Sequence, residues 1–263
     1  MMTKPSQLTG DNASWFEPDW PLPAGVKALV TTRQGGVSVG PYGTNNLGLH
    51  VQDCPQSVET NRAALLSYMG VEHIQWLEQI HSIDVVEAQP DQWVRTADAS
   101  FTRQSGLALA IMTADCVPVL FASQDGSEVA AAHAGWRGLA QGVLAETVKP
   151  LNASGQHLSA YIGPCISQHH FEVGVDVLEV FFAGADNPEQ MTQISACFLA
   201  HPLKPLHFLA DLTALTRLKL QALGVEDIYT SQSCTYADVD DFYSYRRDSL
   251  TGRFASLIWK TML

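Results

Sequence analysis

The chain has 263 residues, of which 46% are apolar and only 16% are charged, so we expect it to fold around a sizeable core. Its 15 basic and 27 acidic residues give a formal net charge of −12, which disfavours a nucleic-acid polymer or an anionic membrane surface as a partner. No export signal or membrane-spanning segment is evident. Five widely spaced cysteines without a CxxC pair indicate a reduced, cytoplasmic protein.

Short runs rich in branched and aromatic residues recur along the chain and predict β-strands. In chain order these runs cover residues 26–32, 75–81, 83–88, 107–112, 118–122, 128–133, 158–163, 227–230 and 254–260. Segments with helical spacing of apolar residues cover residues 56–69, 139–148, 173–182 and 211–223. The last of these helices has Asp211 as its expected N-cap and Gly224 just past its end. The predicted fold class is therefore α+β, with a mixed β-sandwich core flanked by helices.

No internal repeat, low-complexity tract or long linker divides the chain. The best candidate breaks, near Pro90 and at residues 183–188, are short. We therefore expect a single domain over residues 1–263, with residues 1–19 as a flexible N-terminal tail.

Residues 31–53 form a glycine-dense segment with little apolar content, which predicts a long loop. A loop of this length is more often functional than idle. It contains neither the P-loop pattern nor a GxGxxG fingerprint. Arg33, Asn46 and His50 are its candidate substrate-binding residues, because such side chains can hold phosphate or sugar hydroxyls. A solvated loop without a ligand is the alternative.

Three polar side chains, those of His81, Cys116 and His133, stand at or just beyond the ends of predicted strands. Two imidazoles and a thiolate suit Zn²⁺, and three protein ligands leave a coordination position open for chemistry. Their long spacings match no zinc-finger pattern, so a buried cysteine and packed histidines are the alternative. A fourth ligand from Cys165 or Cys234 would instead make the site closed and structural.

A second chemical interpretation uses the same residues without a metal. Cys116 would be a nucleophile, His133 its base, and Asp115 the group that orients the base. The pattern alone does not separate this cysteine hydrolase from a metal site, since both need the same thiol and imidazole.

Two further segments carry arginines in settings that suit an anionic ligand. The HAGWRG turn passes from a strand into a helix through two glycines, with Arg137 beside the free N–H groups. An ordinary strand-to-helix turn is the alternative. Near the C-terminal end, aromatic residues alternate with arginines, including Arg247 and Arg253, and could clamp a planar base. A folded hairpin with Arg–Asp pairs is the alternative there.

Taken together, several segments closely resemble the YfiH family over almost the whole chain, from about Trp20 to Lys260. They are TTRQGGVS, NLGLH, WLEQIHSIDV, TADCVPVLF, AAHAGWRGLAQGVL, YIGPCI, FEVG and FYSYRRDSLTGRFASLIW. Members of this family have been described as laccase-like polyphenol oxidases, peptidoglycan editing factors and zinc-containing purine nucleoside phosphorylases. The resemblance implies His81, Cys116 and His133 as metal ligands. It also implies the YfiH-like β-sandwich, a fold shared with cysteine hydrolases of the cytotoxic necrotizing factor type.

The implied activity is zinc-dependent phosphorolysis of adenosine and inosine, with S-methyl-5′-thioadenosine as a further candidate and adenosine deamination as a second reaction. The expected partners are thus a purine nucleoside and phosphate, in a monomer or weak homo-oligomer. Arg33, His50 or Arg137 would position the phosphate, and Asp115 would be the proton shuttle of the deamination. Alternatives are a cysteine-type hydrolase that edits peptidoglycan precursors and a structural zinc or redox module. Copper is the less favoured metal, because a laccase would need about ten histidines and the chain has nine.

Overall fold

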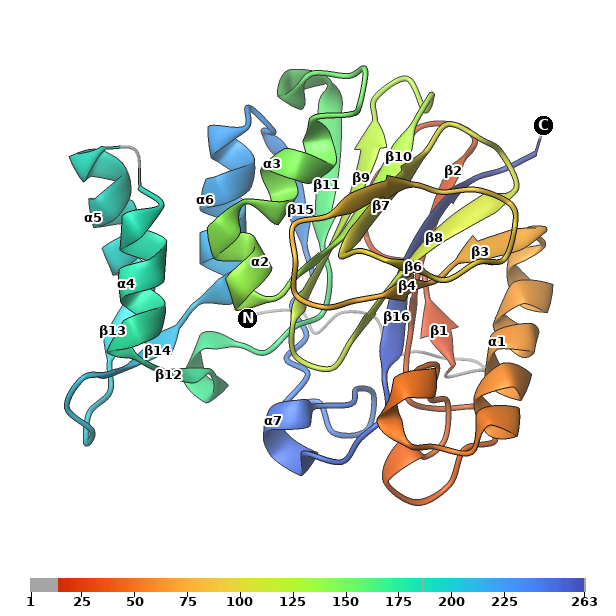
Figure 1. The fold of residues 1–263 in the computed structure, drawn as a ribbon, viewed down its shortest axis with the longest axis horizontal. Coiled ribbons are helices and arrows are strands. Elements are labelled where there is room, and N and C mark those ends of the chain that lie inside the picture. Colours follow the sequence, from red (N-terminus) through yellow and green to blue (C-terminus); the bar gives the residue numbers. More distant parts are fainter. Residues whose placement is uncertain (1–13, 186, 263) are drawn as a thin grey trace, which may run out of the picture.

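The structure is a computed structural model that describes residues 14–185 and 187–262. Two β-sheets packed face to face form its centre (Figure 1). The first sheet has the order β1 (Trp15–Phe16), β2 (Val26–Thr31), β16 (Phe254–Lys260), β8 (Leu107–Thr113) and β3 (His73–Gln75). The second has the order β15 (Asp227–Thr230), β11 (Leu158–Ile162), β9 (Val117–Ser123), β10 (Val129–Ala134), β7 (Ala99–Thr102) and β5 (Val85–Glu87).

The inward side chains of both sheets form one buried cluster, in which Ile111 and Ile258 of the first sheet meet Leu120 of the second. The long strands of this core alternate between this inner cluster and an outer one, as the two faces of a pleated strand require. In β8, for example, Ile111 belongs to the inner cluster and Ala110 to the outer one. The predicted α+β sandwich is therefore confirmed.

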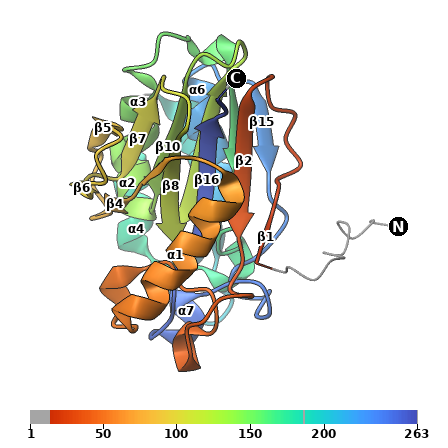
Figure 2. The same ribbon diagram turned by 90° about the vertical axis from the view of Figure 1, so that its right-hand side faces the viewer.

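Helices cover the outer faces of the two sheets. Helix α1 (Pro55–Met69) crosses the first sheet and packs Leu65 and Met69 against Leu29 and Leu257 (Figure 2). The outer face of the second sheet carries α2 (Trp136–Gln141), α3 (Val143–Val148), α4 (Val175–Ala183), α5 (Pro188–Ala196) and α6 (Leu212–Ala222). None of the helices in the described part of the chain is long and apolar enough to cross a membrane.

Smaller elements complete the described chain. A three-stranded sheet has the order β12 (Glu172–Gly174), β14 (His207–Ala210) and β13 (Phe198–Ala200), and β4 (Leu77–Glu78) pairs with β6 (Arg95–Thr96). The single turn α7 (Tyr245–Asp248) and the loop after β2, with its 3-10 turns Gly40–Tyr42 and Leu49–Val51, gather at the same end of the sandwich (Figures 1 and 2). That end carries the candidate site.

The structure differs from the predicted elements where a local break interrupts the apolar pattern. Residues 75–81 do not form one strand: β3 pairs with β8, whereas β4 pairs with β6, so the chain leaves the first sheet at Trp76. Residues 139–148 do not form one helix, because Gly142 has φ 102° and separates α2 from α3. The polar or short segments β1, β6, β7, β12, β13, β14, α5 and α7 were not predicted.

The predicted N-terminal tail lies only partly in the described chain, since residues 1–13 are outside it. Of the remainder, Trp15 and Phe16 pair with Thr31 and Val30 of β2. Trp20, directly after the predicted tail, is buried. Residues 14–19 are therefore anchored to the first sheet.

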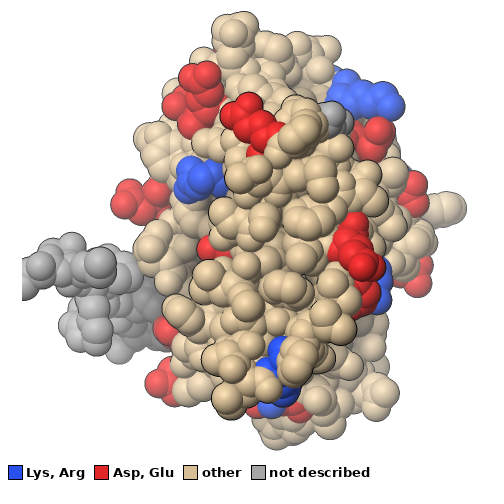
Figure 3. Space-filling model, turned by 90° about the vertical axis from the view of Figure 1, so that its left-hand side faces the viewer, with Lys and Arg blue, Asp and Glu red and all other residues tan. Residues whose placement is uncertain are grey.

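The side of the molecule that carries α4 and α5 has a largely uncharged surface (Figure 3). Basic side chains are scattered over this face rather than gathered into a continuous patch.

Candidate metal centre

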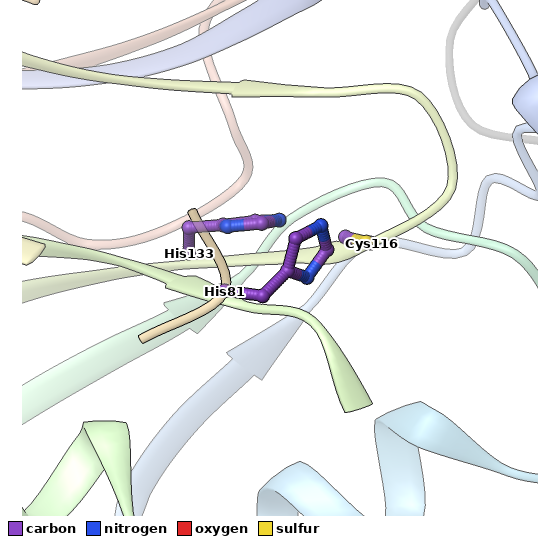
Figure 4. A group of neighbouring side chains, drawn as sticks. All are labelled: His81, Cys116 and His133. Atoms are coloured by element: carbon purple, nitrogen blue, oxygen red, sulfur yellow. The ribbon is translucent and has the colours of Figure 1, made fainter. Parts of the chain in front are cut away.

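The side chains of His81, Cys116 and His133 point toward one another at the loop end of the sandwich (Figure 4). One nitrogen from each histidine and the cysteine sulfur lie within 4.8 Å of one another, and the two imidazole centroids are 4.7 Å apart. Ligand atoms around a tetrahedral zinc ion are about 3.3–3.7 Å apart. Small side-chain rotations can close the difference, so the donor set and its geometry fit a divalent metal.

The three ligands come from three separate places in the chain. His133 lies in β10 opposite Pro118 of β9, and Cys116 lies in the turn that joins β8 of the first sheet to β9 of the second. His81 follows β4 in a left-handed conformation with φ 63°. Among the described residues, neither Cys165 nor Cys234 joins this cluster. The cluster could therefore hold a metal ion with three protein ligands.

Asp98 holds two of the ligands in place. Its Oδ1 atom lies 2.7 Å from Nδ1 of His133 and accepts a hydrogen bond from the backbone N–H of His81 at 3.0 Å. Its Oδ2 atom accepts hydrogen bonds from the backbone N–H groups of Ile80 and Ser82 and from the Ser82 hydroxyl. A carboxylate behind a histidine ligand fixes the ring and raises its basicity. The group that orients His133 is thus Asp98, and the prediction of Asp115 in that place was wrong.

The electrostatics of the cluster follow from these contacts. Burial alone would lower the pKa of His133, but hydrogen bonds to Asp98 and to Cys116 outweigh it and raise the pKa to about 9. Burial would raise the pKa of Asp98, yet the His133 and Ser82 contacts hold it at about 2. Desolvation and the neighbouring His133 lower the pKa of His81, which favours the neutral imidazole that a metal requires.

Gly135 has no side chain, which leaves space for the side chains of His81 and Cys116 to approach each other. A Cβ atom at this position would lie 2.5 Å from Nδ1 of His81 and 3.3 Å from Sγ of Cys116. The first of these separations is shorter than real carbon contacts allow. The glycine of the HAGW segment is therefore required by the ligand cluster itself.

Asp115 connects the cluster to the C-terminal segment. Its Oδ1 accepts a hydrogen bond from the hydroxyl of Thr235 and its Oδ2 one from the backbone N–H of Arg246, both at 2.7 Å. Asp115 is buried and has φ 106°, a conformation that turns the chain sharply before Cys116. Both carboxylate oxygens are thus engaged in holding the loop that covers this end of the sandwich.

Three of the predicted substrate-binding residues form hydrogen bonds within the protein. Arg33 donates to the carbonyl groups of residues 43 and 239 and lies over the ring of Tyr243, which ties the loop after β2 to the C-terminal segment. Arg247 donates to three carbonyl groups between residues 235 and 242. Asn46 is buried, and its side chain bonds to Gly48, Asp53 and the backbone of residue 253. Their substrate-binding roles stay predictions.

Two predicted residues keep accessible side chains near the cluster. Arg137 is exposed, lies 4.2 Å over the ring of Trp136, and lowers the pKa of His81 by its charge. His50 is exposed, and the positive charges of Arg253 and Arg62 lower its pKa in addition to desolvation. Arg253, which the sequence had suggested only as part of an aromatic clamp, thus lies close to the centre. Its position directly before the last strand was the available signal.

The C-terminal aromatic and arginine segment is not a hairpin. Residues 231–253 form turns and the short helix α7 rather than paired strands. A cavity of about 710 Å³ lies beside part of this segment and is lined by Phe16, Tyr161, Arg217, Tyr229 and Phe242, among others. None of its lining residues is a ligand of the cluster, so the large cavity and the metal centre are different places.

Residues 27–261 match the family model described as multi-copper polyphenol oxidoreductase laccase. The chain belongs to this family. It is 47% identical over 246 residues to the purine nucleoside phosphorylase PA4543 of Pseudomonas aeruginosa, which covers 94% of this chain and 98% of that protein. It is 46% identical over 244 residues to the purine nucleoside phosphorylase YfiH of Escherichia coli, which covers 92% and 97%.

Two solved structures share the fold. The protein NMB0706 of Neisseria meningitidis is 45% identical with a TM-score of 0.88, and the match covers 95% of this chain and all of that one. YlmD of Geobacillus stearothermophilus is 30% identical with a TM-score of 0.84, covering 95% and 97%. The resemblance to the YfiH family inferred from the motifs is therefore confirmed.

Proposed function

We propose that this protein is a zinc-dependent purine nucleoside phosphorylase acting on adenosine, inosine and S-methyl-5′-thioadenosine. The observation that carries the proposal is the convergence of His81, Cys116 and His133 at one end of the sandwich. Support comes from relatives at 46–47% identity that are named purine nucleoside phosphorylases. We expect a cytoplasmic monomer or weak homo-oligomer.

The reaction has definite physical requirements. An oxygen of phosphate forms a bond to C1′ of the ribose while the bond from C1′ to the purine nitrogen breaks. The electron pair of the broken bond leaves with the purine, which takes up a proton, and positive charge develops on the sugar in the transition state. The products are the free base and ribose 1-phosphate.

The residues of the centre contribute positions and charge. His81, Cys116 and His133 would hold the divalent ion, which would supply Lewis-acid chemistry at this end of the sandwich. Asp98 fixes the tautomer of His133, so that the ring nitrogen facing Cys116 is the one available as a ligand. Arg137 and His50 are the predicted substrate-binding residues whose side chains stay accessible.

Adenosine deamination is the second part of the proposal. Water would replace the amino group at C6 of the purine and release ammonia, a reaction that a catalytic zinc site supports. Asp115, the predicted proton shuttle, has each carboxylate oxygen in a hydrogen bond to the C-terminal loop. We therefore expect Asp115 to hold that loop in both reactions.

The deciding experiment incubates purified protein with a panel of purine nucleosides with and without phosphate. We expect free base and ribose 1-phosphate only with phosphate, loss of activity in a chelator, and recovery with zinc rather than copper. Cys116→Ala should abolish both metal binding and activity, whereas Cys54→Ala, at an exposed thiol outside the cluster, should keep both. Full activity of metal-free protein would refute the proposal.

A cysteine-type hydrolase that edits peptidoglycan precursors is the second candidate, and a specific contact favours it. His133 forms side-chain hydrogen bonds to both Cys116 and Asp98. This is the arrangement of a nucleophile, its base and the carboxylate that orients the base. Such an enzyme would keep its activity in a chelator and lose it on alkylation. Turnover of amide substrates by metal-free protein would favour this candidate.

A further inference from the structure

Two arginines lie on either side of the turn that carries His50. Arg62 of α1 donates from Nε to the carbonyl of Leu47 at 2.9 Å, and the backbone N–H of Leu47 donates to the carbonyl of Arg253 at 3.0 Å. The backbone N–H of Arg253 donates to Oδ1 of Asn46. These hydrogen bonds fix residues 46 and 47 between the two arginines. His50 lies directly after them, in the 3-10 turn Leu49–Val51.

Gly48 lets the side chain of Arg253 pass against this turn. A Cβ atom at position 48 would lie 3.0 Å from Cγ and 3.2 Å from Cβ of Arg253. The described hydrogen bonds of the guanidinium come from Nη1, which donates to the carbonyl groups of Thr251 and Gly252. The fold thus positions the guanidinium group of Arg253, and its Nε and Nη2 atoms have N–H groups that can donate to a ligand.

The charges of Arg62 and Arg253 are only partly balanced by nearby carboxylates. Among the described residues, no ion pair includes Arg62 or Arg253. Glu59 and Asp115 are the carboxylates near enough to act on these two arginines, and Asp115 is already engaged. Desolvation lowers the pKa of Arg62 to about 10 and also lowers that of Arg253. An anion placed here would offset the cost of holding these charges partly out of water.

The cationic group lies next to the metal centre. Arg253 directly precedes Phe254, which pairs with Thr113 at the end of β8, three residues before Cys116. Nη2 of Arg62 contacts the sulfur of Met112, at the end of β8 that leads to Cys116. An anion held between Arg253 and His50 would therefore lie beside the metal.

We propose that Arg253 and His50, with Arg62 behind them, form the subsite for the phosphate co-substrate. Arg253 provides two directed N–H donors to a tetrahedral oxyanion, and the His50 ring adds one more hydrogen bond. Arg62 lies over the ring of Trp76 at 4.0 Å and contributes charge from a fixed position. The assignment of this anion as a reactant rests on the proposed phosphorolysis, whereas its binding does not.

The test measures inorganic phosphate binding to zinc-loaded protein by calorimetry, together with the KM values for phosphate and for nucleoside. Arg253→Gln and His50→Gln should each weaken phosphate binding and raise the phosphate KM by about 10-fold or more. The nucleoside KM should change less than about 3-fold, as expected when binding of the other substrate is removed. Arg95→Gln, at an exposed ion pair, is the control and should change neither value.

The outcomes separate this subsite from the proposed function. One outcome is that wild-type protein and variants all lack phosphorolysis activity while phosphate binding still depends on Arg253 and His50. That result would support the phosphate subsite and refute the proposed function. If wild-type protein is active and folded variants at both positions keep wild-type phosphate affinity and KM, the subsite is refuted. His50→Gln guards against misfolding, because its side chain is exposed.

Discussion

The Nδ1 atom of His133 lies 2.7 Å from Oδ1 of Asp98, and both side chains are buried. The same carboxylate collects the backbone N–H groups of residues 80–82, so one side chain positions two metal ligands from distant parts of the chain. Asp98 is therefore the residue on which the geometry of the centre depends most.

Replacing Asp98 by Asn should lower metal affinity by about 10- to 100-fold, because His133 loses its orienting carboxylate. Competition with a chromophoric chelator measures the change. Asp91→Asn, at an exposed carboxylate, is the matched control and should keep wild-type affinity. An Asp98→Asn protein with unchanged metal affinity would show that the contact has no role in ligation.

Gly135→Ala should prevent metal binding, since the added methyl group would occupy the space between His81 and Cys116. Metal content after purification with zinc in the buffer measures this effect. Gly184→Ala introduces the same group where the nearest atom is 3.4 Å away, an ordinary contact, and should bind metal normally. Equal zinc content in both variants would contradict the prediction.

The stability of metal-free protein should fall as pH rises from neutral to alkaline values. The pKa of His133 is raised from 6.5 to about 9 in the folded state, so its contribution is fully present below about 6.5 and is lost as pH rises through about 9. Urea unfolding in a chelator at several pH values measures the change. His133→Gln should flatten this part of the profile, and an unchanged slope in that variant would assign the effect to other groups.

Asp115→Ala should destabilise the fold without removing the metal. The buried hydroxyl of Thr235 and the N–H of Arg246 would lose their acceptor, at a cost of about 1–3 kcal/mol for each unsatisfied group. Urea unfolding and zinc stoichiometry test the two halves of this statement. Glu226→Ala, at an exposed carboxylate, is the control and should unfold like wild type. Loss of zinc from folded Asp115→Ala protein would disprove it.

The sequence predicted that His81, Cys116 and His133 lie together, because polar residues at strand ends are visible in an apolar pattern. It missed Asp98, which lies in the polar stretch before β7 and carries no apolar signal; its importance arises only when residues 80–82 and 133 meet around it. Arg33 and Arg247 were predicted to bind an anion because arginine commonly does so. Their hydrogen bonds to backbone carbonyl groups depend on tertiary folding, so the sequence does not reveal them.

The sandwich itself was predictable from the strand runs, while its connections were not. The break between β3 and β4 depends on pairing with two different partners, and the break at Gly142 on a backbone conformation that glycine readily permits. The first break also shapes the centre, because it releases the chain from the first sheet before His81.

Strand β16 inserts between β2 and β8, so the middle of the first sheet is supplied by a segment that leaves the ribosome long after its two neighbours. Until then, β2 and β8 present unpaired edges in the nascent chain, which are sites for intermolecular association. Arg253 arrives with the same segment. Closure of the sheet and completion of the anion-binding end should therefore be one late event in biogenesis, and chains stalled before residue 253 should depend on chaperones.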